Sequence, residues 1–377
     1  MLNIPFNKPF IIGKELNYIE QAIVSGKISG NGSYTKKCHH YFEQQFNIGK
    51  SLLTSSCTHA LEMCAILADI KAGDEVIMPS YTFVSTANAF VLRGAKIIFA
   101  DSQPHHPNID ETAVEQLITP KTKAIIVVHY GGVACNMEVF KQLATKHNLI
   151  LIEDAAQAID SYHNNHALGS IGHLSAFSFH ETKNIIAGEG GLLGVNDAKL
   201  FNRAEIIWEK GTNRSAFFRG EIDKYNWVDI GSSFLPSEIT AAFLYAQLEN
   251  LKTIQDKRKK LVEQYFYHLS QLKNKVGVEC PIIPSYATNN AHNFYLICNS
   301  LDERTKLIQH LKTKGVMAVF HYMCLHKSPF YKANHDGRTL ANANRFEDCL
   351  VRLPLFYNLS IDEVDFICDE INQFYKI

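Results

Sequence analysis

The chain has 377 residues, of which 46% are hydrophobic and 20% charged, and its formal net charge is −1. At this length we expect either two domains or one large α/β domain with an extension, with ample material for a buried core. The small net charge and the lack of any run of basic residues exclude a global field that would attract nucleic acid or an anionic membrane.

The N-terminal segment MLNIPFNKPFIIGKEL lacks the charged stretch followed by an apolar core that marks a signal peptide, and the longest apolar runs are strand-sized. We therefore expect no membrane insertion. The nine cysteines are odd in number, scattered, and without a C-x-x-C pair. This pattern predicts reduced thiols and a cytoplasmic protein, with neither a disulfide framework nor a metal site.

Short apolar runs alternate with helical patterns through the first half of the chain. Strands are expected, in chain order, at 51–54, 74–80, 95–101, 123–132, 149–157, 175–180 and 190–196, and helices at 60–70, 82–94, 111–118, 136–148 and 198–211. Unbroken β-branched and leucine runs between helices indicate a mostly parallel sheet that is covered on both faces. Ligands of such sheets bind at the carboxyl ends of the strands.

The pattern changes after about residue 236. A long helical stretch, 236–272, has a proline near its start, and a strand, a helix and a strand are expected at 293–299, 304–315 and 316–322. We therefore predict a large domain over 1–240, with the N-terminal segment, and a smaller α/β domain over 241–377.

Two residues that follow predicted strands carry the side chains that pyridoxal phosphate (PLP) chemistry requires. Asp154 ends a buried strand, and Lys183 follows the next one after a short polar turn. An aspartate there could simply cap a helix at 155–160, and most lysines are solvated. Together, however, they could supply a carboxylate for a cationic ring nitrogen and an amine for a Schiff base. Both could lie at one edge of the sheet.

A phosphate site is the third requirement. The segment TSSCTHALE, 54–62, places small hydroxyl residues before a helix, whose free N–H groups suit a phosphate dianion, although simple capping by Ser or Thr is commoner. Ser178 could add a hydroxyl donor, or face outward from its strand. The glycines of AGEGG, 187–191, would let the backbone pass close to a bound cofactor.

Other motifs do not support a different chemistry. The adjacent histidines at 39–40 and 105–106 lie in hydrophilic segments without an acidic ligand set, so we expect them at the solvated surface. The segment HETKN is not the H-E-x-x-H of a metalloprotease, and GEGG is not the G-x-G-x-x-G of a dinucleotide site.

The ordered motifs PSYTFVSTANA, VVHYGG, IEDAAQ, GSIGHLSAFSFHETKN and GEGGLL resemble the DegT/DnrJ/EryC1/StrS family of sugar aminotransferases. The likeness runs from IPFNKP near the start to RLPLFYNLS near the end. It implies PLP as cofactor and the type I fold of PLP-dependent transferases, which is aspartate aminotransferase-like. That fold has a large domain with a mostly parallel sheet between helices and a smaller α/β C-terminal domain.

The resemblance assigns roles position by position. Lys183 matches the Schiff-base lysine, and Asp154 matches the partner of the ring nitrogen. The remaining matches are Cys57, Thr58 and Ser178 for the phosphate, Phe83 stacked on the ring, Gln157 near the ring hydroxyl, Asn226 for the phosphate of the other subunit, and His321 and Tyr322 near the sugar nucleotide. Cys57 departs from the glycine or alanine common there, so only its backbone is expected to act. Asn226 implies a homodimer with shared active sites.

The segments LRGAKI, EKGTNRSAFFRG, WVDIGSSF and AVFHYMCLH resemble the subgroup of dTDP-4-amino-4,6-dideoxygalactose transaminases. The implied reaction converts dTDP-4-dehydro-6-deoxy-D-glucose and L-glutamate to the 4-amino sugar and 2-oxoglutarate, for enterobacterial common antigen or O-antigen. Amination at C3 or of a UDP-sugar stays open, as does a non-catalytic regulatory protein on the same fold. Relatives that dehydrate sugars carry histidine where this chain has Lys183.

Overall fold

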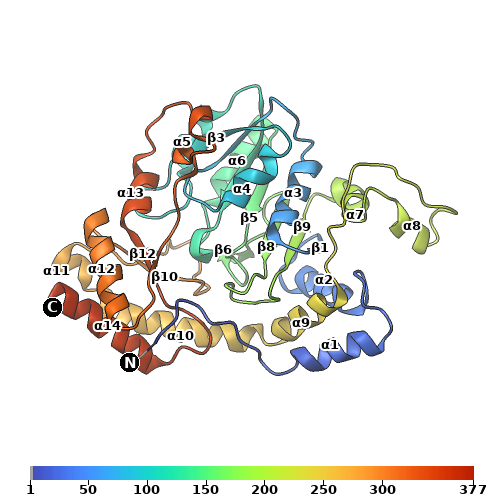
Figure 1. Ribbon diagram of the computed structural model, residues 1–377. Coiled ribbons are helices and arrows are strands. Elements are labelled where there is room, and N and C mark those ends of the chain that lie inside the picture. Colours follow the sequence, from blue (N-terminus) through green and yellow to red (C-terminus); the bar gives the residue numbers. More distant parts are fainter. Residues whose placement is uncertain (1–2) are drawn as a thin grey trace.

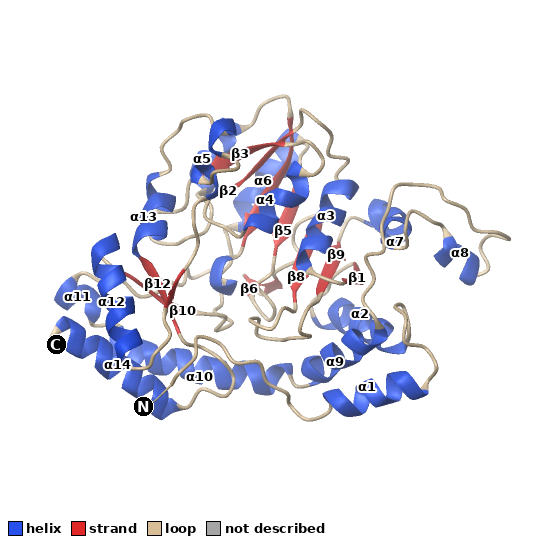
Figure 2. Ribbon diagram, in the orientation of Figure 1, coloured by secondary structure: helices blue, strands red, loops and turns tan. Residues whose placement is uncertain are grey.

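A seven-stranded sheet forms the centre of the computed structural model, which describes residues 3–377 (Figures 1 and 2). Its strand order is β1-β9-β8-β5-β4-β2-β3. The strands are β1 (Lys50–Thr54), β2 (Glu75–Pro79), β3 (Lys96–Ala100), β4 (Thr122–Val128), β5 (Ile150–Asp154), β8 (Leu174–Ser178) and β9 (Gly191–Val195). The run from β3 to β8 is parallel, whereas β9 is antiparallel to both of its neighbours. The expected mostly parallel sheet is confirmed.

Helices cover both faces of this sheet because alternate strand residues point to opposite sides. In β4, Ala124 and Ile126 belong to one hydrophobic cluster, and Ile125 and Val127 belong to another. The first cluster includes residues of α3 (Cys57–Leu67), α4 (Val84–Val91) and α7 (Phe201–Trp208). The second includes residues of α2 (Ser33–Gln45), α6 (Met137–His147) and α9 (Glu238–Glu249).

The C-terminal third forms a smaller layered unit around an antiparallel sheet. Its strands are β10 (Phe294–Ile297), β12 (Leu350–Leu353) and β11 (Val319–Phe320), with β12 in the middle, and its helices are α10 (Leu251–Leu269), α11 (Leu272–Val276), α12 (Leu301–Thr313), α13 (Ala341–Cys349) and α14 (Ile361–Tyr375). A third hydrophobic cluster joins α10, α12 and α14 to this sheet. Figure 1 shows α10 running beneath both units.

The long helix predicted over 236–272 is divided. It breaks at Asn250, whose φ of −108° and ψ of 12° end α9 before α10 begins. The side chain of Ser237 caps α9 by accepting from the Thr240 N–H, so Pro236 lies before the cap instead of in the first turn. The helix α1 (Glu15–Val24) and α2 have no counterpart among the predicted elements.

The remaining short α-helices and strands are α5 (Glu111–Val114), β6 (Tyr162–His163), β7 (His166–Ala167) and α8 (Arg214–Phe218). The predicted domain boundary after residue 240 falls inside α9. At the other end of the chain, Ile4 forms a β-bridge with Val316 in the C-terminal unit. The division into domains stays a prediction. No helix within 3–377 is both long and apolar enough to cross a bilayer.

A buried hydrogen bond between Glu153 and His129 holds the strand that carries Asp154. Glu153 lies 3.0 Å from the ring of His129 and accepts N–H bonds from Gly169, Ile171 and Gly172. Burial alone would raise the pKa of Glu153, but the hydrogen bond and charge of His129, together with the backbone donors, outweigh it and hold the pKa below its usual range. The loop before β8 is thereby fixed to β5.

Replacement of Glu153 by Gln should reduce the free energy of unfolding by about 3 kcal/mol near neutral pH, because it leaves His129 and three backbone N–H donors without their carboxylate. A depressed carboxylate pKa stabilises the fold above its unfolded value of about 4.3, and this contribution is lost as the pH falls through the folded value. The difference in the free energy of unfolding between the wild type and Glu153→Gln, measured with urea, should therefore become smaller at acid pH.

The matched control is Glu115→Gln, which removes an exposed carboxylate that also contacts a histidine, His147. Its expected cost is much smaller than that of Glu153→Gln, because water screens the charge of an exposed carboxylate. Equal losses for the two variants would show that the Glu153 pair does not hold the fold.

Candidate active site

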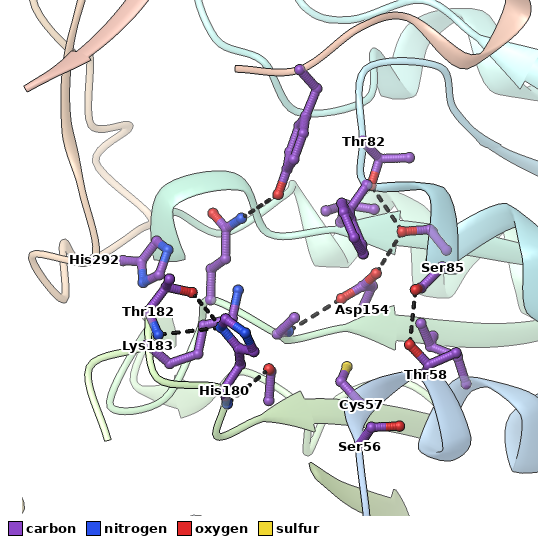
Figure 3. A pocket seen from close by; sticks show the side chains of 18 of the residues that line it. Ser56, Cys57, Thr58, Thr82, Ser85, Asp154, His180, Thr182, Lys183 and His292 are labelled. Atoms are coloured by element: carbon purple, nitrogen blue, oxygen red, sulfur yellow. Dashed lines mark hydrogen bonds between the residues drawn. The ribbon is translucent and has the colours of Figure 1, made fainter. Parts of the chain in front are cut away.

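The strand ends meet at one edge of the large sheet. Val128 at the end of β4 lies opposite Asp154, and Ser178 at the end of β8 lies opposite Gly191. A cavity of about 600 Å³ opens at this edge (Figure 3). Its walls come from α3, α4, the ends of β4, β5 and β8, the loop that carries Lys183, and the C-terminal unit. The expectation that polar residues after the strands gather at one place is met here.

Asp154 is buried, with 5% of its surface exposed, and both of its oxygens are held. Thr86 donates its hydroxyl to Oδ2 at 2.7 Å, and the Ala156 N–H donates to Oδ1 at 3.2 Å. Because the Thr86 proton is used in this way, the hydroxyl of Thr82, 2.8 Å away, donates to Thr86 in turn. Residues 155–161 form turns, not a helix, so Asp154 does not cap one.

Burial raises the pKa of Asp154, while the hydrogen bonds from Thr86 and Ala156 and the charges of Lys183 and His129 oppose the rise. A cation placed against a buried carboxyl group stabilises it, because the cation favours the charged form. Asp154 is therefore suited to hold a positively charged group at the floor of the cavity.

Lys183 lines the same cavity at the end of a turn, in which its N–H donates to the carbonyl of His180 at 2.9 Å. Burial lowers the pKa of its amine; Cys57 and Asp154 act against this, and the charge of Arg352 reinforces it. The lowered pKa increases the neutral, nucleophilic fraction of the amine at neutral pH. The structure thus brings the two residues selected from the sequence into one cavity.

The N-terminus of α3 forms another wall of the cavity. Ser56 caps this helix by accepting from the His59 N–H at 3.1 Å, which leaves the first-turn amides at Cys57 and Thr58 without intrahelical partners. The Thr58 hydroxyl is 2.8 Å from that of Ser85. Ser178 also lines the cavity, at the end of β8. Amides, hydroxyls and the positive helix end together suit a phosphate.

Gly191 allows this helix end to approach the sheet. A Cβ atom at position 191 would clash with the Cys57 nitrogen and the Ser56 carbonyl. Only glycine permits β9 to pass this close to the start of α3. Gly190 next to it has room for a methyl group, since its nearest neighbours would be 3.5 Å away.

Aromatic and amide side chains form a further wall of the cavity. The rings of Phe83 and Tyr322 lie 6.2 Å apart, and 55% of the Phe83 surface is exposed. Gln157 donates to the Tyr322 hydroxyl at 3.0 Å and accepts from the Gly131 N–H at 2.7 Å. His321, next to Tyr322, also lines the cavity. These predicted residues are therefore near neighbours in the structure.

Asn226 is the predicted site residue that the structure does not bring to the cavity. It lies exposed on the arm around α8, which extends away from the sheet in Figure 1. Its backbone bonds to Asn213 on the same arm. Within one chain Asn226 is separate from Lys183 and Asp154, so the role expected for it requires another subunit.

The profile of the DegT/DnrJ/EryC1/StrS aminotransferase family matches residues 9–372. The chain belongs to this family. GDP-perosamine synthase of Escherichia coli O157:H7 is 30% identical over 383 residues, with 100% of both chains covered. Spore coat polysaccharide biosynthesis protein SpsC of Bacillus subtilis (strain 168) is 28% identical over 385 residues, covering 99% of this chain and 97% of that protein.

A putative sugar aminotransferase from Streptococcus pneumoniae, Spr1654, has the same fold. Its PMP form superposes with a TM-score of 0.91 at 25% identity, covering 100% of this chain and 98% of that one. Its PLP form gives 0.90 at 25% identity, with coverage of 100% and 99%. The expected fold of a PLP-dependent sugar aminotransferase is therefore confirmed. These relatives do not single out the dTDP-4-amino-4,6-dideoxygalactose subgroup.

Thr86, His292 and Arg352 are among the cavity residues that the sequence analysis did not single out. Thr86 holds Asp154, and it lies in the motif PSYTFVSTANA, four residues after Thr82. His292 is buried beside Lys183, with its Nδ1 2.9 Å from the Asn184 Oδ1. Arg352 lies in the segment RLPLF, which drew attention only as a family motif. His292 and Arg352 come from the C-terminal unit, and no local pattern marks them as cavity residues.

The expectation that both histidine pairs are solvated was wrong for one member of each. His39 accepts the Leu53 N–H at 2.8 Å, and burial lowers its pKa to about 3. His106 is 3% exposed, and burial likewise lowers its pKa to about 3. Both are packing residues. Within 3–377 no cluster of three or more metal-ligating side chains occurs, and the nine cysteines are unpaired.

The matched variants Gly191→Ala and Gly190→Ala test the approach of α3 to the sheet. Gly191→Ala should raise the dissociation constant for pyridoxal phosphate by at least about tenfold, because its methyl group must displace the start of α3. Gly190→Ala should bind as the wild type does. Fluorescence titration measures both constants, with circular dichroism to establish that each variant is folded. Wild-type binding by Gly191→Ala would contradict this account of the helix end.

Proposed function

We propose that this protein is a PLP-dependent aminotransferase of nucleotide-linked keto sugars, with Lys183 and Asp154 as its catalytic residues. The observation that carries the proposal is their meeting in one cavity beside the free N-terminus of α3. Retention of Lys183 argues against both a sugar dehydratase and a non-catalytic regulatory protein, since neither needs that amine.

The residues of the cavity fit the cofactor. The orphan amides of Cys57 and Thr58, with the hydroxyl of Ser178, would hold its phosphate. Asp154 would face the ring nitrogen, where a positive charge would offset the cost of burying the charged carboxylate. Phe83 would lie against the ring and Gln157 near the ring hydroxyl. When bound, PLP supplies an electron sink for the carbon that loses or gains the amine.

Lys183 would carry out the proton transfers. Its lowered pKa lets the neutral amine take a proton from the α-carbon of the donor amino acid. The same amine would then deliver that proton to the cofactor carbon that carries the transferred nitrogen. L-Glutamate is the proposed donor, and 2-oxoglutarate leaves before the sugar enters. His321 and Tyr322, which line the cavity, would contact that sugar.

We further propose a homodimer in the cytoplasm with shared sites, in which Asn226 of each chain reaches the phosphate held by the other. The exposed arm that carries Asn226 supports this, because Trp227 beside it is 82% exposed and Phe218 is 69% exposed. Large apolar side chains on a projecting segment mark an interaction surface.

The proposed reaction is formation of dTDP-4-amino-4,6-dideoxy-D-galactose from dTDP-4-dehydro-6-deoxy-D-glucose, for enterobacterial common antigen or O-antigen. The sequence segments around Arg93, Arg219 and His321 support this subgroup. A GDP-linked sugar is the second candidate, because a relative named GDP-perosamine synthase matches along the whole chain. The name of SpsC supports a product for a surface polysaccharide. UDP-sugars and amination at C3 are the other candidates.

Incubation with L-glutamate and a panel of dTDP-, GDP- and UDP-linked keto sugars should yield, for the dTDP-4-keto-6-deoxy sugar, a product with an axial amine at C4 by NMR. Proton couplings distinguish the two configurations at C4. An equatorial amine, an amine at C3, or preference for the GDP-sugar would overturn the assignment of the substrate while leaving the aminotransferase proposal intact.

Purified protein with PLP should show a visible absorbance band, and Lys183→Ala should lose it together with covalently held cofactor. The exposed Lys199→Ala serves as the control and should keep the band. A colourless wild type that PLP does not reconstitute would refute PLP dependence.

A further inference from the structure

The cavity contains a guanidinium that forms a salt bridge with no carboxylate of residues 3–377. Arg352, on β12 of the C-terminal sheet, lines the cavity together with Lys183 and Asp154. Among residues 3–377, no carboxylate lies within 4.0 Å of it. Its Nε is buried and has no hydrogen-bond partner. A partly buried cation with unused donors is costly unless an anion binds to it.

The neighbours of Arg352 hold the guanidinium in place without cancelling its charge. Its Nη1 donates to the Nε2 of His321 at 3.3 Å, and its guanidinium lies 4.8 Å from the ring centre of Phe6. Because Nε2 of His321 accepts, Nδ1 carries the ring proton and donates to the Tyr130 hydroxyl at 2.9 Å. The side chain is thus positioned by a neutral ring on one side and an aromatic face on the other.

The positive charge of Arg352 affects the pKa values of its neighbours in the cavity. Burial lowers the pKa of His321 well below its ordinary value, and the charges of Arg352 and Lys183 reinforce this, so the ring stays neutral. Arg352 also lowers the pKa of Lys183, which requires the two cations to lie near each other. An anion at Arg352 would therefore bind close to the reacting amine.

We propose that Arg352 binds the carboxylate on the reacting carbon of the amino donor. This inference rests on the proposed function. The planar fork of arginine matches a planar carboxylate through parallel hydrogen bonds, and the Nε of Arg352 has no hydrogen-bond partner among residues 3–377. In an amino acid this carboxylate is bonded directly to the carbon that exchanges its amine, so it lies near Lys183. The diphosphate of a nucleotide sugar instead hangs from C1, across the sugar ring from a C4 keto group.

The two half-reactions of a transaminase separate this role from sugar binding. Arg352→Gln should raise the KM for L-glutamate by on the order of 100-fold in the half-reaction that aminates the cofactor, because a bidentate charged contact is lost. The half-reaction of the aminated enzyme with the keto sugar should change less than about threefold. Arg352→Lys should fall between, since it keeps the charge and loses the fork.

A binding measurement gives a readout independent of turnover. Maleate, a dicarboxylate that cannot react, should bind the full-length cofactor-loaded wild type in calorimetry, and Arg352→Gln should weaken it by on the order of 100-fold. The matched control is Arg345→Gln, on α13 of the same unit. Arg345 lies 5.9 Å from the Phe346 ring and pairs with Glu279 outside the cavity, and its loss should leave maleate binding unchanged.

Slowing of the sugar half-reaction alone would assign Arg352 to the nucleotide sugar and overturn the proposal. Equal slowing of both half-reactions, with a lower melting temperature, would make Arg352 structural and overturn it as well. If the wild type aminates no keto sugar but loses maleate binding in Arg352→Gln, the proposed sugar substrate fails and the carboxylate site stands. Maleate binding unchanged by Arg352→Gln overturns the site whatever the sugar.

Discussion

The site depends on one buried carboxylate at the carboxyl end of the central strand. Asp154 is desolvated, and its two oxygens are fixed by Thr86 and Ala156. Its neighbour Glu153 points to the other face of the strand and ties the loop before β8 to β5. A carboxylate in this state is stabilised by a cation, and the protein leaves room for one where the cavity reaches Asp154.

The rest of the cavity distributes charge around that carboxylate. The helix end of α3 supplies positive dipole at one wall, Lys183 supplies an amine at another, and Arg352 enters from the C-terminal unit. The helix end and Arg352 lie at different walls of a cavity that also contains the carboxylates of Asp154 and Glu189, so the site can bind an anionic ligand at more than one place. A cofactor with a phosphate and a donor with a carboxylate meet this need, because each anion has its own positive group.

The sequence analysis predicted most of the large sheet because its strands are short unbroken apolar runs, and it placed Lys183 and Asp154 by their positions after such runs. It missed the division of the long helix at Asn250, since nothing local there is stronger than the surrounding helical pattern. It missed Arg352 and His292 because their approach to Lys183 depends on how the C-terminal unit packs. It placed His39 and His106 at the surface, although His39 accepts a hydrogen bond from the Leu53 N–H and His106 is buried.

The central claim is that the Lys183 amine forms the covalent link to PLP. The most direct measurement is reduction of the PLP-loaded protein with borohydride, followed by proteolysis and mass spectrometry of the lysine-containing peptides. The account predicts a pyridoxyl group on the peptide that contains Lys183 and on no other. A label on a different lysine, or no label on a protein that binds PLP, would contradict it.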